Sequence, residues 1–181
     1  CHAVAYIELK RCLSGENHDQ PKNQTPAGDD HSVHTDSSFK VTDEQKDDFF
    51  RIYDDSLQRL ANFYADRVMW AATEKNTLEP AVEKLINPAE PKEQSSSSLS
   101  FLIHRVNNFS KDLGLVLEFL DLNATAFSKI LKKYDKRTGS ILRESKLREL
   151  KAQHPYLYDG GEMKNHKNIA ADWINQLELL L

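Results

Sequence analysis

Four lysines in the stretch LNATAFSKILKKYDKRTG, residues 122–139, have a spacing that suits an anion-binding site. Lys129, Lys132, Lys133 and Lys136 lie at i, i+3, i+4 and i+7, so a helix places all four on one side. Four ammonium groups within about two turns repel one another by a few tenths of a kcal/mol per neighbouring pair. A polyanion would turn this repulsion into attraction. Lysine suits a ligand with many phosphates, because each ammonium is a mobile point charge.

The charge of the chain is unevenly distributed. Residues 129–151 contain nine Lys or Arg and three acidic residues, whereas the whole chain of 181 residues has a net charge of −4. The segment therefore carries +6 and the remainder carries −10. Such a positive pole raises the local concentration of anionic ligands. A lysine run on an amphipathic helix is also common as a plain solvated face, and spacing alone leaves both interpretations open.

The remaining motifs predict neither catalysis nor a cofactor. The sequence has no Gly-rich phosphate loop, nucleophile elbow or His-Glu-x-x-His motif. His31 and His34 lie beside several acids, but their polar segment lacks ligands at tetrahedral spacing, so we expect no metal site. Cys1 and Cys12 match no common zinc or redox signature, which favours a reduced, intracellular protein.

Composition also limits the classes of partner. The net charge of −4 gives no reason to expect a nucleic-acid binder. The sequence has no run of 18 apolar residues, so no membrane span is expected, and it shows no signal peptide. We therefore expect a cytoplasmic chain, or a cytosol-facing one if the parent is a membrane protein.

Helical periodicity accounts for most of the chain, and no alternating strand pattern occurs, so the predicted fold class is all-α. The segments with a helical spacing are 1–13, 42–72, 78–86, 99–120, 124–137, 141–152 and 168–181. A polar, acidic insert at 14–41 is expected to be disordered, and residues 87–98 are expected to form a loop. The two long helices should lie antiparallel.

Several local signals predict where these helices begin and end. Thr42 and Gln45 fit a capping box at the start of the first long helix. Pro80 should interrupt the segment at 78–86, which predicts a short second helix or a continuation of the first. Asn123 is a suitable N-cap for the helix that carries the lysines, and Gly139 should end it.

Three segments resemble one family. LNATAFSKILKKYDKRTG is similar to the fourth-helix motif of SPX domains, in which Leu-Asn-x-Thr-Gly-Phe-x-Lys-Ile-Leu-Lys-Lys-x-Asp-Lys is typical, and departs from it at Ala126, where glycine is usual. The opening AYIELKRCL resembles the Tyr-x-x-Leu-Lys-Lys motif of the family's N-terminal helical hairpin. The stretch FFRIYDDSLQRLANFY looks like the family's first long helix. The resemblance covers most of residues 3–150.

The resemblance implies an architecture. It predicts an SPX-type bundle with two long antiparallel central helices, an N-terminal helical segment and short C-terminal helices. The SPX domain would span 1–152, and 153–181 would be its C-terminal helical segment or the start of a linker. Family members begin with a short helix, often Met-Lys-Phe-Gly, whose lysine also lines the phosphate site. Because this opening is absent before Cys1, we expect an N-terminally truncated domain.

The resemblance also implies a binding site rather than a catalytic one. Its ligand would be inositol hexakisphosphate or an inositol pyrophosphate. By motif position, the ligand-binding residues would be Tyr6, Lys10, Lys129, Lys132, Lys133 and Lys136. Tyr6 and Lys10 are four residues apart, so a phenol and an ammonium can reach one phosphate from one helix face. Without the family, Tyr6 is equally well interpreted as a half-buried aromatic at a helix interface, and Lys10 as solvated surface.

The function implied is that of a phosphate-homeostasis sensor module. Inositol polyphosphates would bind the lysine face, and the module would regulate a protein partner or a fused C-terminal domain. A second hypothesis is the regulatory end of a larger enzyme or transporter, such as a polyphosphate polymerase, a glycerophosphodiesterase or a phosphate transporter or exporter. A third is a helical protein–protein interaction module whose basic face takes an acidic partner. In each case the chain itself is expected not to be an enzyme.

Overall fold

The computed structural model of the chain describes residues 2–13, 41–87 and 96–181. Within these ranges it consists of six helices without a strand, which confirms the all-α prediction. The helices are α1 (His2–Cys12), α2 (Asp43–Ile86), α3 (Ser96–Thr138), α4 (Arg143–Gln153), α5 (Tyr156–Asp159) and α6 (Gly161–Glu178). The predicted insert, up to residue 40, and most of the predicted loop at 87–98 lie outside the described residues.

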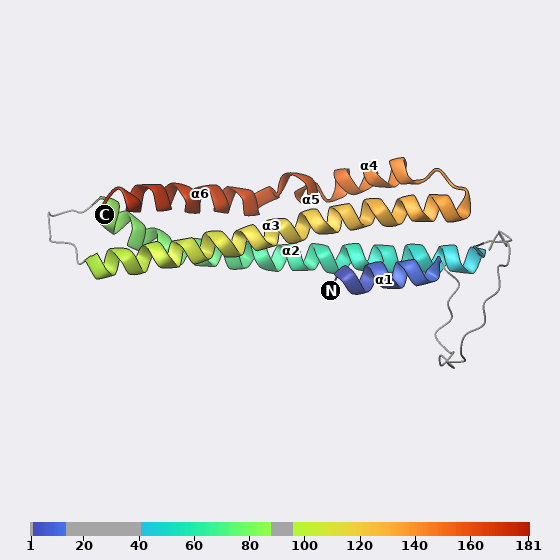
Figure 1. The fold of residues 1–181 in the computed structure, drawn as a ribbon, viewed down its shortest axis with the longest axis horizontal. Helices are drawn as coiled ribbons and strands as arrows, with labels where there is room; N and C mark the ends of the chain where they lie inside the picture. The colour runs from blue at the N-terminus through green and yellow to red at the C-terminus, as the bar shows by residue number, and fades with distance from the viewer. Residues whose placement is uncertain (1, 14–40, 88–95) are drawn as a thin grey trace, which may run out of the picture.

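Two long helices form the centre of the molecule and run antiparallel, as expected (Figure 1). Helix α2 has 44 residues and α3 has 43, so each is about 65 Å long at 1.5 Å per residue. The predicted capping box begins α2, because the Gln45 backbone N–H donates to Thr42 Oγ1 at 3.2 Å and the Thr42 N–H donates to Gln45 Oε1 at 2.9 Å. Each of these bonds satisfies a donor that a helix start leaves unpaired.

Pro80 does not interrupt α2, so the possibility of a separate short helix at 78–86 was wrong. A proline inside a helix removes one backbone hydrogen bond and clashes with the preceding turn. Leu78 and Val82, on either side of Pro80, are 0% and 1% exposed. Their burial in the core holds this part of α2 helical despite the lost bond.

Asn123 is not an N-cap either, and the lysines do not lie on a separate helix. Residues 96–138 form one continuous α3, with Asn123 buried inside it. The Asn123 side-chain Nδ2 donates to the Phe119 carbonyl at 2.7 Å, one turn earlier. Satisfied in this way, the amide no longer competes with the helix for backbone N–H groups.

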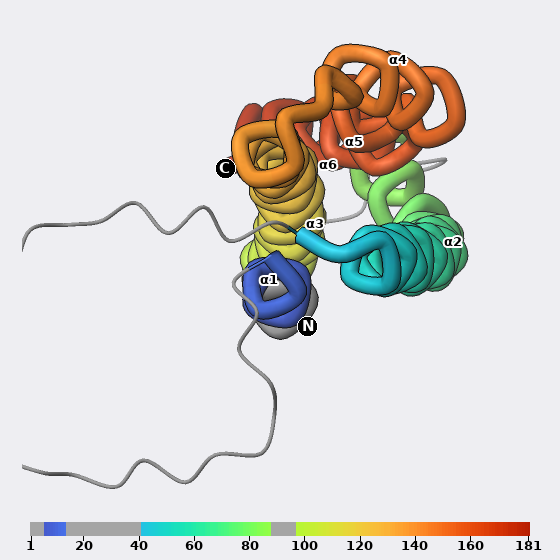
Figure 2. Tube along the Cα trace, turned by 90° about the vertical axis from the view of Figure 1, so that its right-hand side faces the viewer, coloured from blue at the N-terminus to red at the C-terminus, as the bar shows by residue number. Residues whose placement is uncertain are grey.

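The α2–α3 pair is covered on opposite sides by the shorter helices (Figure 2). On one side α6 contacts both long helices, and α4 and α5 contact α3. On the other side α1 contacts both long helices over part of their length (Figure 1). Every helix contributes to one hydrophobic core, whose largest fully buried side chains include Leu9, Leu13, Phe49, Leu78, Leu113, Leu120, Ile130, Leu131, Leu150, Met163 and Leu177.

The C-terminal helices differ from the prediction in their boundaries. Between the predicted helices at 141–152 and 168–181 lies the short helix α5, and α6 begins at Gly161 rather than near residue 168. Gly160 and Gly161 have φ values of +81° and +50°, which glycine adopts at little cost. A Cβ at Gly161 would collide with the Tyr64 hydroxyl, which accepts a hydrogen bond from the Glu162 N–H at 3.0 Å. This close approach fixes the start of α6 against α2.

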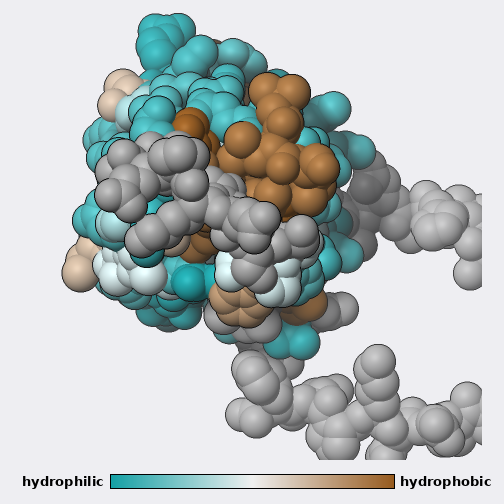
Figure 3. Space-filling view, turned by 90° about the vertical axis from the view of Figure 1, so that its left-hand side faces the viewer, coloured by the Kyte–Doolittle hydropathy of each residue, from teal (hydrophilic) through white to brown (hydrophobic). Residues whose placement is uncertain are grey.

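Apolar side chains are also exposed at the end of the bundle where the C-terminus lies. Figure 3 views this end and shows an apolar patch on it. Leu179 and Leu181, in the last turn of the chain, are 87% and 77% exposed. Among the described helices, none combines the length and the apolar character that a bilayer span requires.

Candidate anion-binding site

The four lysines lie on the last three turns of α3, which ends at Thr138. Lys129, Lys132 and Lys136 are exposed, and Lys133 is half-buried. At about 100° per residue, Lys129 and Lys136 point in nearly the same direction, with Lys132 and Lys133 on either side of them. The four side chains therefore spread over an arc of about 100° on the face of α3 that points away from the core. We call this surface the lysine face.

Three of these lysines have no anionic partner in the described part of the chain. No ion pair or hydrogen bond joins Lys129, Lys132 or Lys136 to a described residue. Several other cations are paired, for example Lys75 with Glu79 at 2.8 Å and Arg105 with Glu74 at 2.9 Å. The lysine face therefore retains its positive charge, and the sequence around it adds more.

Helix α1 lies beside the side of α3 that carries Lys133. Tyr6 lines the same pocket as Ala126 and Ile130 of α3. Lys133 follows Ala126 by seven residues, so it lies on the same side of α3, about 10 Å farther along. Because α1 and α3 run in the same direction, Lys10 lies one turn beyond Tyr6 toward the lysines (Figure 1). The structure thus brings α1 to the lysine face; ligand binding by Tyr6 and Lys10 stays a prediction.

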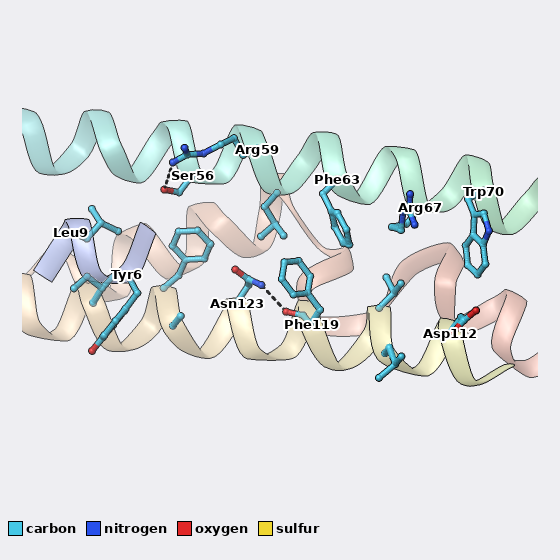
Figure 4. A pocket seen from close by; sticks show the side chains of 16 residues that line it. Tyr6, Leu9, Ser56, Arg59, Phe63, Arg67, Trp70, Asp112, Phe119 and Asn123 are labelled. Atoms are coloured by element: carbon cyan, nitrogen blue, oxygen red, sulfur yellow. Dashed lines mark hydrogen bonds between the residues drawn. The ribbon is translucent and has the colours of Figure 1, made fainter. Parts of the chain in front are cut away.

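Tyr6 lies at one end of a large groove between α2 and α3 (Figure 4). The groove has a volume of about 820 Å³ and is lined mainly by apolar side chains, including Phe63 and Phe119. Half-buried, the Tyr6 ring packs at this helix interface, as the alternative interpretation expected. Its hydroxyl points away from the centre of the groove (Figure 4). One tyrosine can therefore pack with its ring and still present an O–H to a ligand.

An aromatic cluster packs between α2 and the turns of α3 that carry the lysine face. Tyr134, next to Lys133, is 3% exposed, and its ring centroid lies 4.6 Å from that of Phe49 and 5.0 Å from that of Phe50. Burial raises the pKa of the Tyr134 phenol, an effect that nearby Lys46 partly offsets, so the phenol stays neutral at physiological pH. The cluster joins α2 to the last turns of α3 and fixes the backbone that carries the lysines.

Asp135, which lies beside the lysine face on the side of α4, joins α3 to α4. Its two carboxylate oxygens accept hydrogen bonds from the backbone N–H groups of Leu142 and Arg143, at 3.0 and 2.9 Å. Helix α4 starts at Arg143, and its N-cap residue Leu142 has no side chain able to cap. Asp135 therefore caps α4 from a neighbouring helix, and a carboxylate is favourable at a helix N-terminus.

Replacing Asp135 with alanine is expected to lower the free energy of unfolding by about 1 kcal/mol, because two N–H groups at the start of α4 lose their acceptor. For a chain of this size the melting temperature should fall by about 2–4 °C, measured by circular dichroism. Asp121→Ala is the control, because Asp121 is an exposed acid of α3 that makes no ion pair with a described residue. Equal melting temperatures for the two variants would contradict the capping role.

Other functional possibilities are limited in the described residues. They contain no group of three or more His, Cys, Asp or Glu side chains that could hold a metal. His31 and His34 lie outside the described ranges. The sequence interpretation missed the cap formed by Asp135, which has no short-range signal, because its partners are seven and eight residues away.

Comparison with known proteins gives one consistent result. A model of the SPX domain family matches residues 90–149, a stretch that includes the whole lysine face. The chain is 30% identical over 146 residues to SPX domain-containing protein 2 of Arabidopsis thaliana, which covers 77% of this chain and 47% of that protein. It is 31% identical over 101 residues to SPX domain-containing protein 4 of Oryza sativa subsp. japonica, covering 52% of this chain and 31% of that protein.

A further relative is a transporter by name. The chain is 43% identical over 63 residues to an uncharacterized transporter of Schizosaccharomyces pombe, which covers 34% of this chain and 7% of the transporter. The chain thus spans less than half the length of each of these relatives.

Proposed function

Because this chain belongs to the SPX domain family, we propose that it is a phosphate-homeostasis sensor module whose lysine face binds inositol polyphosphates or inositol pyrophosphates. The observation that carries the proposal is the set of three exposed lysines without ion pairs among the described residues. Tyr6 and Lys10 of α1 and Lys129, Lys132, Lys133 and Lys136 of α3 would supply the contacts.

The binding mechanism is electrostatic. Each ammonium forms a charge-assisted hydrogen bond with a phosphate oxygen, and such bonds are about twice as strong as bonds between neutral groups. Bringing a polyanion to the lysine face also relieves the mutual repulsion of the lysines. Because these groups are exposed, salt screens the interaction over a distance of about 8 Å at physiological ionic strength.

Titration calorimetry with inositol hexakisphosphate tests the proposal. We expect measurable binding in low salt and a steep decrease in affinity as potassium chloride is raised from about 50 to 500 mM, because the Debye length becomes shorter than the spacing of the charges. Unphosphorylated myo-inositol should give no heat, since it offers the ring without the charge. Absence of binding to inositol hexakisphosphate in low salt would overturn the proposal.

We also propose that the module regulates a larger protein or a separate partner. The match to a transporter of which the chain covers only 7% favours a segment within a longer chain, whereas the SPX domain-containing proteins favour a separate regulator. In either case the signal would pass from the ligand-bound lysine face to a protein partner or a fused domain. We propose that this face is exposed to the cytosol in both arrangements.

A further inference from the structure

A second, smaller pocket lies between α3, α4 and α5. Its volume is about 290 Å³, and its walls include Ser128 of α3, Arg148 and Lys151 of α4, and Tyr158 of α5. It brings two cations, of Arg148 and Lys151, together with the two hydroxyl groups of Ser128 and Tyr158. These side chains come from three helices, so the tertiary fold, rather than one helix face, creates the pocket.

The polar groups of this pocket are available to a ligand. Arg148 and Lys151 are exposed and make no ion pair with the described residues. Ser128 Oγ accepts a hydrogen bond from Arg143 Nη2 at 3.1 Å, so its own O–H can still donate. Lys151 Nζ lies 5.9 Å from the centre of the Tyr158 ring, a cation–π contact that holds the ammonium at the pocket wall.

One acid lines the same pocket, and its charge is partly compensated. Glu144 Oε1 lies 3.2 Å from Nη1 of Arg143, the residue that also bonds Ser128. Burial raises the pKa of the Tyr158 phenol, so Tyr158 keeps its O–H at neutral pH and remains a donor. The pocket therefore presents two full positive charges and two O–H donors against one paired carboxylate.

The pocket adjoins the lysine face. Lys132 follows Ser128 by four residues, so the two lie one above the other on α3, about 6 Å apart along its axis. Among the four lysines, Lys132 is the one turned toward α4. The cap that Asp135 forms on α4 fixes the distance between this lysine and the cations of α4.

We propose that Ser128, Arg148, Lys151 and Tyr158 form a second phosphate subsite that extends the lysine face onto α4. The proposal rests on the proposed function, because the subsite would take an outlying phosphate of a ligand already bound at Lys132. A ligand with phosphates around the whole ring reaches both the lysine face and the subsite, whereas a ligand with few phosphates reaches only one of them. Arg148 and Lys151 are thus specificity-determining residues that favour highly phosphorylated inositols.

The double variant Arg148→Ala/Lys151→Ala tests the subsite by calorimetry on the full chain. We expect its affinity for inositol hexakisphosphate to fall about tenfold or more, because two charge-assisted contacts are lost. Its affinity for an inositol trisphosphate should fall by less than about threefold, since fewer phosphates span the two parts. Lys84→Ala/Lys164→Ala is the matched control, because it removes the same charge from exposed lysines elsewhere, and its affinities should stay within about twofold of wild type.

The outcomes separate the two proposals. The subsite is wrong, and the proposed function stands, if Arg148→Ala/Lys151→Ala and the control lower the affinity for inositol hexakisphosphate equally. The same conclusion follows if the double variant lowers the affinity for the trisphosphate as much as that for the hexakisphosphate. If wild type does not bind inositol hexakisphosphate, the proposed function is wrong. Circular dichroism of each variant establishes that a loss of affinity is not a loss of fold.

Discussion

Alanine substitution of Lys129, Lys132 and Lys136 together is expected to lower the affinity for inositol hexakisphosphate by about a hundredfold to a thousandfold. Each lysine would lose one charge-assisted contact, worth about 1–1.5 kcal/mol at an exposed site, and each 1.4 kcal/mol is a factor of ten. The three side chains make no ion pair with a described residue, so their removal breaks no interaction that the described structure records. The triple variant should therefore remain as helical and as stable as wild type.

Calorimetry gives the affinity, and circular dichroism gives the helix content and melting temperature. The matched control is Lys84→Ala/Lys111→Ala/Lys164→Ala, which removes three exposed lysines from α2, α3 and α6 and changes the net charge equally. This control should lose at most a few-fold in affinity, because its charges are more than a Debye length from the site. Wild-type affinity in the lysine-face variant, with a normal helix content, would disprove the proposed ligand site.

Phe49→Ala is expected to lower the free energy of unfolding by about 3–5 kcal/mol, the cost of removing a large aromatic side chain from a core. Phe49 is 0% exposed, and its ring lies 4.6 Å from that of Tyr134 and 6.3 Å from that of Tyr53. The substitution leaves a cavity where α2 meets the last turns of α3. Urea denaturation followed by circular dichroism measures the change.

Phe101→Ala is the control for this second prediction. Phe101 is 64% exposed, so the same chemical change on the surface should alter the free energy of unfolding by less than about 0.5 kcal/mol. A loss below 1 kcal/mol for Phe49→Ala would contradict the central place of the aromatic cluster. A loss in the expected range leaves native protein in the absence of urea if the wild type has the usual stability of about 5–15 kcal/mol.

The fold class was predictable because helical periodicity is strong in α2 and α3. Local signals fared unevenly. The capping box at Thr42 was predicted correctly, since both of its partners lie within four residues. Pro80 and Asn123 were misleading signals. Burial of Leu78 and Val82 overrides the local preference of the exposed Pro80, and burial of Asn123 itself overrides its preference for a helix start. The unfavourable helix propensity of one residue costs at most a few kcal/mol, and the free energy gained by packing the core is larger.

The candidate site was predictable only in the part that follows from helix geometry. The spacing of the four lysines follows from helix geometry, so their common face on α3 could be derived from the sequence. The closeness of α1 to that face could be stated only through the family resemblance, since contacts between distant segments leave no local signal. The pocket at Arg148 and Lys151 depends on the packing of α4 and α5 on α3, and no motif in the sequence points to it.

In the proposed site, docking of α1 against the long helices is coupled to ligand binding at the lysine face. Helix α1 has 11 residues, and helices shorter than about 12–15 residues are marginal in water, so it depends on docking against α2 and α3. Residues 14–40 separate it from α2 in the sequence, so docking brings together segments that lie far apart along the chain. A ligand that bridges α1 and the end of α3 adds its binding free energy to this docking. By thermodynamic reciprocity, any partner that prefers α1 docked strengthens ligand binding by the same factor, and one that displaces α1 weakens it.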